Sequence, residues 1–147
     1  MEPIMPKKSH KPWPERNYNK PIEFIGYYGC LENSFPVTIL VGGIQYPSVE
    51  HALQATKVSD VFLKHKISKT EYLPTALKLL EDTPVRPNWK DVRYATLEQL
   101  MRLKFQTSSK CKDVLISTGA RPLLSPKDAM MGKILMKIRN EIVGRAN

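Results

Sequence analysis

Hydrophobic and polar positions change their spacing about a third of the way along the chain. Before residue 47, apolar and aromatic residues form short runs at 22–28 and 37–41, and such runs predict strands. Gly42-Gly43 separates the second run from residues 44–46, which is typical of a tight hairpin. Beyond residue 48 the spacing becomes helical. The pattern therefore predicts an α+β fold, with a small antiparallel sheet or hairpin followed by a mainly helical body.

Caps and helix breakers divide this helical part into segments. Ser48 and Asp60 are good N-caps, and Pro74 is tolerated in the first turn of a helix. Residues 84–89 contain two prolines and predict a rigid connection. The helices expected from these signals cover residues 48–57, 60–67, 73–81, 90–106, 113–117 and 128–143.

The first of these helices carries polar side chains along one edge. Its weakly apolar face, expected to pack on the core, consists of Val49, Ala52, Leu53 and Thr56. Glu50, Gln54 and Lys57 follow each other at positions i, i+4 and i+7. Glu50 and Lys57 are separated by about 10 Å along the axis, so they could act on one ligand lying along the helix rather than pair directly. The alternative is that Glu50 only complements the helix dipole and Lys57 is solvated.

Composition narrows the classes of function. The 147 residues suit a single domain, and a hydrophobic content of 41% excludes wholesale disorder. The formal net charge of +9 suits a partner that carries phosphates, either nucleic acid, a nucleotide or a phosphorylated metabolite. The alternative is that the lysines simply cover solvated helix faces.

The chain lacks the spacing of a metal site. Cys30 and Cys111 are far apart, and His51 and His65 have no partners at ligand spacing, so we expect no metal. Neither a P-loop nor GxGxxG is present, and no cofactor is expected. The two cysteines suggest a reducing compartment.

The ends of the chain and its apolar runs suggest where it acts. No apolar run approaches the roughly 18 residues of a membrane helix, so a cytoplasmic protein, or a nuclear one in a eukaryotic host, is expected without a membrane partner. Residues 1–21, rich in proline and lysine, predict a flexible basic arm, and residues 22–147 a single domain.

Several stretches form a set whose order and spacing are distinctive. They are Phe24 with residues 31–35, then residues 43–57, 86–89, Met101 with 104–105, 115–119 and 131–139. Together these stretches resemble the NADAR family, also called YbiA-like. The resemblance covers nearly everything after the arm, and its most specific part is residues 48–57.

This resemblance implies an α+β fold and N-glycosidase chemistry. Family members are associated with hydrolysing the bond between a heterocyclic amine or base and a ribose phosphate or ADP-ribose. Their substrates include early riboflavin-pathway intermediates and ADP-ribosylated guanine in nucleic acid. The resemblance assigns catalysis to Glu50 and a supporting or covalent role to Lys57. The substrate contacts that it implies are Asn33, Gln54, Arg86, Trp89 and Asp128.

One segment departs from the family pattern. Residues 125–133 lack the Trp-Gly and Gly-x-Asn elements that usually precede the terminal helix, while Asp128 stands where the family has an aspartate. Loss of a pocket wall disturbs positioning, and an error near 1 Å can cost about a hundredfold in rate. The alternative function is therefore a non-catalytic module that binds ADP-ribose, a nucleotide or nucleic acid. The expected partner is a phosphorylated ribosyl or ADP-ribosyl substrate, with nucleic acid as a further candidate.

Overall fold

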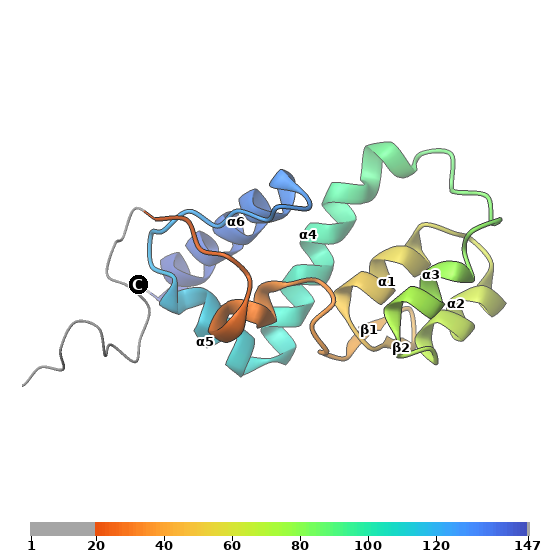
Figure 1. Cartoon of the computed structure of the whole chain (residues 1–147), viewed down its shortest axis with the longest axis horizontal. Helices are drawn as coiled ribbons and strands as arrows, with labels where there is room; N and C mark the ends of the chain where they lie inside the picture. The colour runs from red at the N-terminus through yellow and green to blue at the C-terminus, as the bar shows by residue number, and fades with distance from the viewer. Residues whose placement is uncertain (1–19, 147) are drawn as a thin grey trace, which may run out of the picture.

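The computed structural model describes residues 20–146, so the predicted arm lies almost entirely outside the described residues. Their elements are the 3₁₀ helix η2 (Gly26–Leu31), strands β1 (Ile39–Val41) and β2 (Ile44–Tyr46), and helices α1 (Val49–Thr56), α2 (Val61–Ser68), α3 (Leu73–Lys78), α4 (Trp89–Thr107), α5 (Ser109–Ser117) and α6 (Ala129–Ala146). The α+β fold predicted from the sequence is confirmed (Figure 1).

The hairpin forms where the glycine pair predicts it. β1 and β2 pair antiparallel, with Ile39 opposite Tyr46 and Val41 opposite Ile44. Gly42 and Gly43 have φ angles of 57° and 82°, a backbone conformation that side chains disfavour. Two successive positive φ angles match the right-handed twist of the strands, so the turn closes the hairpin.

The prediction of a strand at residues 22–28 is wrong. Only Ile22 pairs there, through an isolated parallel bridge to Leu123. At Gly26 the φ angle is 57°, which ends the extended backbone and turns the chain into η2. The buried residues of this 3₁₀ helix are Cys30 and Leu31, and the helix packs on α5. The apolar residues therefore reach the core by a tight turn rather than by alternation along a strand.

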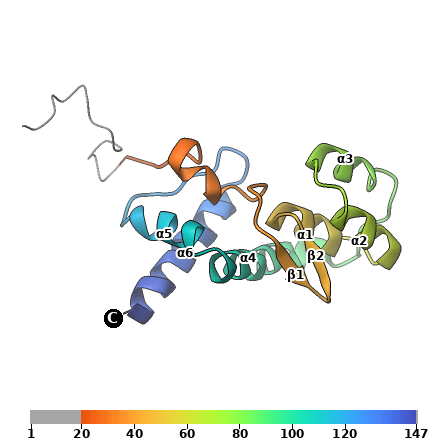
Figure 2. The same ribbon diagram turned by 90° about the horizontal axis from the view of Figure 1, so that it is seen from below.

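Helix α4 is the central element of the molecule. It contacts α1, α5, α6 and β1. Figures 1 and 2 show α5 and α6 on one side of α4 and α1 to α3 with the hairpin on the other. Its buried residues are Leu97, Leu100, Met101, Lys104 and Phe105. This spacing of three and four residues is that of a single helix face, and it places a lysine in the core.

The other predicted helices form with shifted ends. Ser48 and Asp60 cap α1 and α2 through their side chains, as expected. α3 ends at Lys78 rather than at residue 81, and α5 begins at Ser109 because Ser108 accepts a hydrogen bond from the Cys111 N–H.

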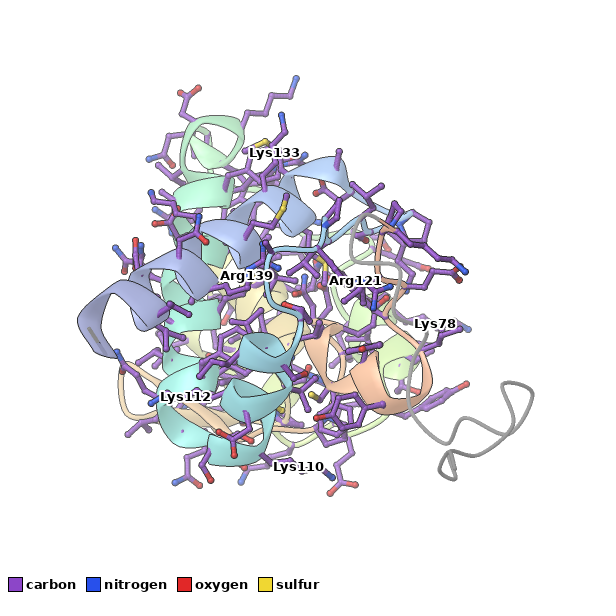
Figure 3. All side chains as sticks on the ribbon, turned by 90° about the vertical axis from the view of Figure 1, so that its left-hand side faces the viewer. Lys78, Lys110, Lys112, Arg121, Lys133 and Arg139 are labelled. Atoms are coloured by element: carbon purple, nitrogen blue, oxygen red, sulfur yellow. The ribbon has the colours of Figure 1, made fainter. Side chains whose placement is uncertain are left out.

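A buried arginine ties α6 to the connection that precedes it. Arg139 Nη1 donates to Thr118 Oγ1 at 2.9 Å and to the Arg121 carbonyl oxygen at 2.8 Å, and Figure 3 labels both arginines. Burial lowers the pKa of Arg139. Gly132 permits the same close packing, because a Cβ there would lie 2.0 Å from the Leu123 carbonyl oxygen. Arg139 thus holds the middle of α6, and the packing at Gly132 positions its start, which forms part of the pocket described below.

The buried face of α1 differs from the predicted one. Its buried residues are Val49, His51, Ala52 and Ala55, whereas Leu53 and Thr56 are only half-buried. His51 is accommodated because its Nε2–H donates to the Thr70 carbonyl oxygen at 2.9 Å and its Nδ1 lies 2.7 Å from Ser48 Oγ. A histidine whose two ring nitrogens are both hydrogen-bonded can be buried at little cost. The buried face of α1 therefore includes His51 in place of Leu53 and Thr56.

Candidate active site

A pocket of about 370 Å³ lies between α1 and the first half of α4. A volume of this size suits a small-molecule ligand. We define the first wall as α1 with the loop 32–34, and the second wall as the first half of α4 with residues 127–131. First-wall residues that line the pocket are Glu32, Asn33, Ser34, Glu50, Leu53, Gln54 and Lys57, and second-wall residues are Trp89, Arg93, Tyr94, Leu97, Lys127, Asp128 and Met131. Leu73 of α3 completes the lining.

Gln54 connects the two charged residues of α1. Its Nε2 donates to Glu50 Oε2 at 2.8 Å, and its Oε1 accepts from Lys57 Nζ at 3.4 Å. The amide thus uses both its donor and its acceptor along the helix edge. Carboxylate, amide and amine are held in one row that faces the pocket.

The loop before the hairpin holds Glu50 from a second side. Asn33 Nδ2 lies 3.4 Å from Glu50 Oε1, and the Glu50 N–H donates to the Asn33 carbonyl oxygen at 3.1 Å. Asn33 Oδ1 is buried and has no hydrogen-bond partner within residues 20–146. An acceptor left without a partner is costly, so a ligand donor at this atom would be favourable.

The buried Lys104 of α4 supports this loop from beneath. Its side chain is 1% exposed, and its Nζ donates to the Glu32 carbonyl oxygen at 2.7 Å. Burial lowers the pKa of Lys104 to about 8, because the low-dielectric core disfavours the charged form. The position of Asn33 beside Glu50 therefore depends on a core lysine.

Two cations cap the C-terminal end of α1. Arg86 Nη1 donates to the Thr56 carbonyl oxygen at 3.0 Å, and Lys64 Nζ donates to the Ala55 carbonyl oxygen at 2.8 Å. The Arg86 N–H also donates to the Lys57 carbonyl oxygen at 3.0 Å. Burial and the neighbouring Arg86 lower the pKa of Lys64. Positive groups are favoured at this end of the helix dipole, and they hold the turn that carries Lys57.

The second wall is organised around Tyr94. The Arg93 guanidinium lies 4.3 Å from the centre of the Tyr94 ring and donates to the Tyr94 hydroxyl. Asp128 Oδ1 accepts from the Met130 N–H at 3.0 Å and lies 3.4 Å from the Tyr94 hydroxyl. The aspartate thus caps the first turn of α6 and links it to α4.

The structure brings most of the sequence-predicted site residues together. Asn33, Glu50, Gln54, Lys57, Trp89 and Asp128 line the pocket. Arg86 lies outside the lining and contacts the end of α1 instead. Their roles toward a substrate stay predictions.

Sequence reasoning missed Glu32, Arg93, Tyr94 and Lys127. For Arg93 a signal was available, because it follows Trp89 by four residues and therefore lies on the same helix face.

Residues 20–146 contain no group of three His, Cys, Asp or Glu side chains able to hold a metal ion. None of the helices described there has the length and apolar character to cross a membrane.

Fold and pocket together define a small α+β domain in which one helix presents a carboxylate, an amide and an amine to a ligand-sized pocket. The family model of the NADAR domain matches residues 23–132, so the chain belongs to the NADAR family. The resemblance stated from the sequence is confirmed. An NMR structure of the E. coli protein YbiA shares the fold, with a TM-score of 0.74, 21% identity, and coverage of 89% of this chain and 92% of that one.

Two relatives indicate how the family varies. A riboflavin biosynthesis protein of Vibrio vulnificus is 32% identical over 131 residues, covering 78% of this chain but only 36% of that protein. An N-glycosidase of Nostoc punctiforme is 28% identical over 135 residues, covering 78% of this chain and 86% of that protein. The chain thus spans about a third of the Vibrio protein and most of the Nostoc protein.

Proposed function

We propose that this protein is an N-glycosidase that hydrolyses the bond between a heterocyclic amine or base and a ribose phosphate or ADP-ribose. The observation that carries the proposal is the row of Glu50, Gln54 and Lys57 lining a pocket of about 370 Å³. The N-glycosidase activity named for the Nostoc relative, which this chain matches over 86% of its length, supports the same reaction.

In the proposed reaction the C–N bond at the anomeric carbon breaks. The base leaves with the electron pair and takes up a proton, and the sugar carbon passes through an oxocarbenium-like state that the Glu50 carboxylate stabilises. Lys57 gives its proton to the leaving base, and the amine so formed captures this carbon as a Schiff base of the opened sugar. Glu50 then takes a proton from water, which hydrolyses the Schiff base and returns the amine. The net change is one water consumed and one base released.

Recognition of the base falls to the apolar part of the pocket. We assign Trp89 to stacking on the heterocycle, beside Leu53, Leu97 and Met131. Asn33 is suited to bind a donor group of the substrate, because its buried Oδ1 has no partner within the described residues. We assign Asp128 to a polar contact at the second wall.

The proposed substrates are riboflavin-pathway ribosyl phosphates or ADP-ribosylated guanine, the latter with nucleic acid as partner. The net charge of +9 suits phosphates on either. Cys30 and Cys111 are both buried free thiols, which is consistent with action in the reducing cytoplasm, or in a nucleus.

Base release from two substrates tests the proposal. Purified protein is incubated with an oligonucleotide carrying ADP-ribosylated guanine and, separately, with a ribosylaminopyrimidine phosphate, and free base is measured by chromatography. We expect release from at least one substrate. Glu50→Gln is expected to abolish it, and Glu23→Gln, at an exposed position outside the pocket, to leave it unchanged.

The covalent step has its own readout. Borohydride added during turnover should reduce the Schiff base and leave the sugar attached to Lys57, detectable by mass spectrometry of the digested protein. Base release without an adduct would restrict Lys57 to a supporting role. Binding of ADP-ribose without release of base from either substrate would contradict the hydrolase proposal and favour a binding module.

A further inference from the structure

The second wall of the pocket carries two cations, Arg93 and Lys127. Arg93 and Lys127 both line the pocket from exposed positions. No salt bridge within residues 20–146 involves either side chain. Arg102, nine residues further along α4, is by contrast paired with both Glu98 and Glu141. The positive charge on the pocket side of α4 is thus available to a ligand.

The acidic side chains of the pocket do not neutralise this pair. Asp128 is the nearest in sequence, and its Oδ1 already accepts from the Met130 N–H and faces the Tyr94 hydroxyl. Glu50 is held by Gln54 and Asn33 on the first wall. Glu32, the third acidic residue of the lining, lies on the first wall. None of the three forms a salt bridge with Arg93 or Lys127 within residues 20–146.

The Tyr94 ring orients Arg93. The guanidinium lies 4.3 Å from the ring centre and uses one terminal nitrogen to donate to the Tyr94 hydroxyl. A guanidinium has five N–H donors, so others stay available in a fixed planar fork. Such a fork suits the oxygens of a phosphate, and a lysine beside it adds a mobile point charge.

We propose that Arg93 and Lys127 form the phosphate subsite of the pocket, binding the phosphate esterified to the substrate's ribose. This inference rests on the proposed function, since it assigns the opposite wall from Glu50 to the phosphate end of that substrate. The ribose then lies between the two walls, with its anomeric carbon toward Glu50 and Lys57. The subsite selects phosphorylated ribosides over plain ribosides.

Comparing ribose 5-phosphate with ribose tests the subsite without any turnover. NMR titration gives the ratio of the two dissociation constants for each protein. Because hydrogen bonds between charged groups are strong, we expect the wild type to prefer ribose 5-phosphate by about tenfold or more. Arg93→Ala and Lys127→Ala should each reduce this ratio, and the double variant should bring it close to one.

Matched charge controls separate a specific subsite from general attraction. Lys133→Ala removes one positive charge from an exposed position of α6 outside the pocket, where Figure 3 labels the residue. Lys90→Ala does the same at an exposed position of α4. We expect both controls to keep the wild-type ratio.

Three results would overturn the subsite. They are a wild-type ratio near one, an unchanged ratio in the double variant, or an equal loss in the Lys133→Ala control. The result is distinguishable from failure of the proposed function. A protein that releases base without preferring ribose 5-phosphate refutes the subsite alone, whereas one that prefers ribose 5-phosphate without releasing base refutes the hydrolase alone.

Discussion

The two walls of the pocket satisfy their polar groups in opposite ways. On the first wall, Glu50, Gln54 and Lys57 bond to one another within a single helix, and Asn33 adds a contact from the preceding loop. On the second wall, Arg93 and Lys127 come from segments far apart in sequence and have no acidic partner within residues 20–146. The first wall is thus organised before any ligand arrives, and the second leaves its charges for the ligand.

This difference suggests that the two walls have different roles in the reaction. Groups that stabilise a transition state act best when they are already oriented, because no reorganisation is then needed during the reaction. Groups that only bind the substrate contribute most to affinity when they have no other partner before the ligand arrives. The contrast predicts that changes in the first wall affect turnover, and that changes in the second wall affect affinity.

The largest expected difference is between the two carboxylates. Glu50→Gln should lower the rate of base release by about 10² to 10⁴, the usual contribution of a general base. Asp128→Asn keeps an oxygen to accept from the Met130 N–H, so α6 stays capped and the rate should fall by less than about tenfold. Steady-state kinetics of both variants makes the comparison. Equal losses in the rate constant would remove the division between the walls.

The support beneath the first wall should show a pH signature. The pKa of Lys104 is about 8 in the fold and 10.5 ordinarily. Below pH 8 Lys104 is protonated in both the folded and the unfolded state, so the folded state bears the full cost of burying its charge. Between pH 8 and 10.5 the unfolded chain keeps a proton that the folded one has lost, so the free energy of unfolding rises by roughly 2 to 3 kcal/mol. Denaturant unfolding across this range should show the rise relative to Lys104→Met.

The buried thiol of Cys30 has the opposite effect on the free energy of unfolding over part of that pH range. Burial raises the pKa of the Cys30 thiol from 9.0 to about 11, so stability falls as the unfolded chain loses this proton first. Lys104→Met leaves Cys30 buried, so subtracting its profile removes the burial contribution of the cysteine, whereas the attraction between Lys104 and the Cys30 thiolate stays in the difference. Lys133→Met, at an exposed position, should follow the wild type, and a flat difference between wild type and Lys104→Met would contradict the buried charge.

The smallest expected effect distinguishes two hypotheses for Arg86, a structural role at the end of α1 and a contact with the substrate. Because its guanidinium bonds the Thr56 carbonyl oxygen, Arg86→Ala should lower the free energy of unfolding by about 1.5 to 3 kcal/mol. Turnover should fall through a displaced Lys57, with little change in KM. Arg93→Ala should do the reverse, raising KM at unchanged stability. If Arg86→Ala instead raised KM at unchanged stability, the residue would contact substrate, as the family resemblance implies.

Local signals were sufficient for much of the fold. The Gly42-Gly43 pair closes the hairpin, and Ser48 and Asp60 cap their helices, because each feature depends on residues only a few positions apart. The failure at residues 22–28 has a nonlocal cause. Ile22 and Phe24 alternate as in a strand, but the partner of Ile22 is Leu123, and the chain then turns at Gly26 onto α5. No neighbouring residue signals the pairing with Leu123, whereas Gly26 is a turn signal within the run itself.

The sequence by itself determined the α1 part of the first wall. Helical periodicity alone places Glu50, Gln54 and Lys57 on one edge, and the capping signal at Ser48 fixes where that helix begins. Only the tertiary structure decided what lies across from them. The second wall joins α4 to residues 127–131, and Lys104 reaches the Glu32 carbonyl oxygen from the core. Such contacts depend on which faces pack together, since burial is decided by the whole core rather than by any local pattern.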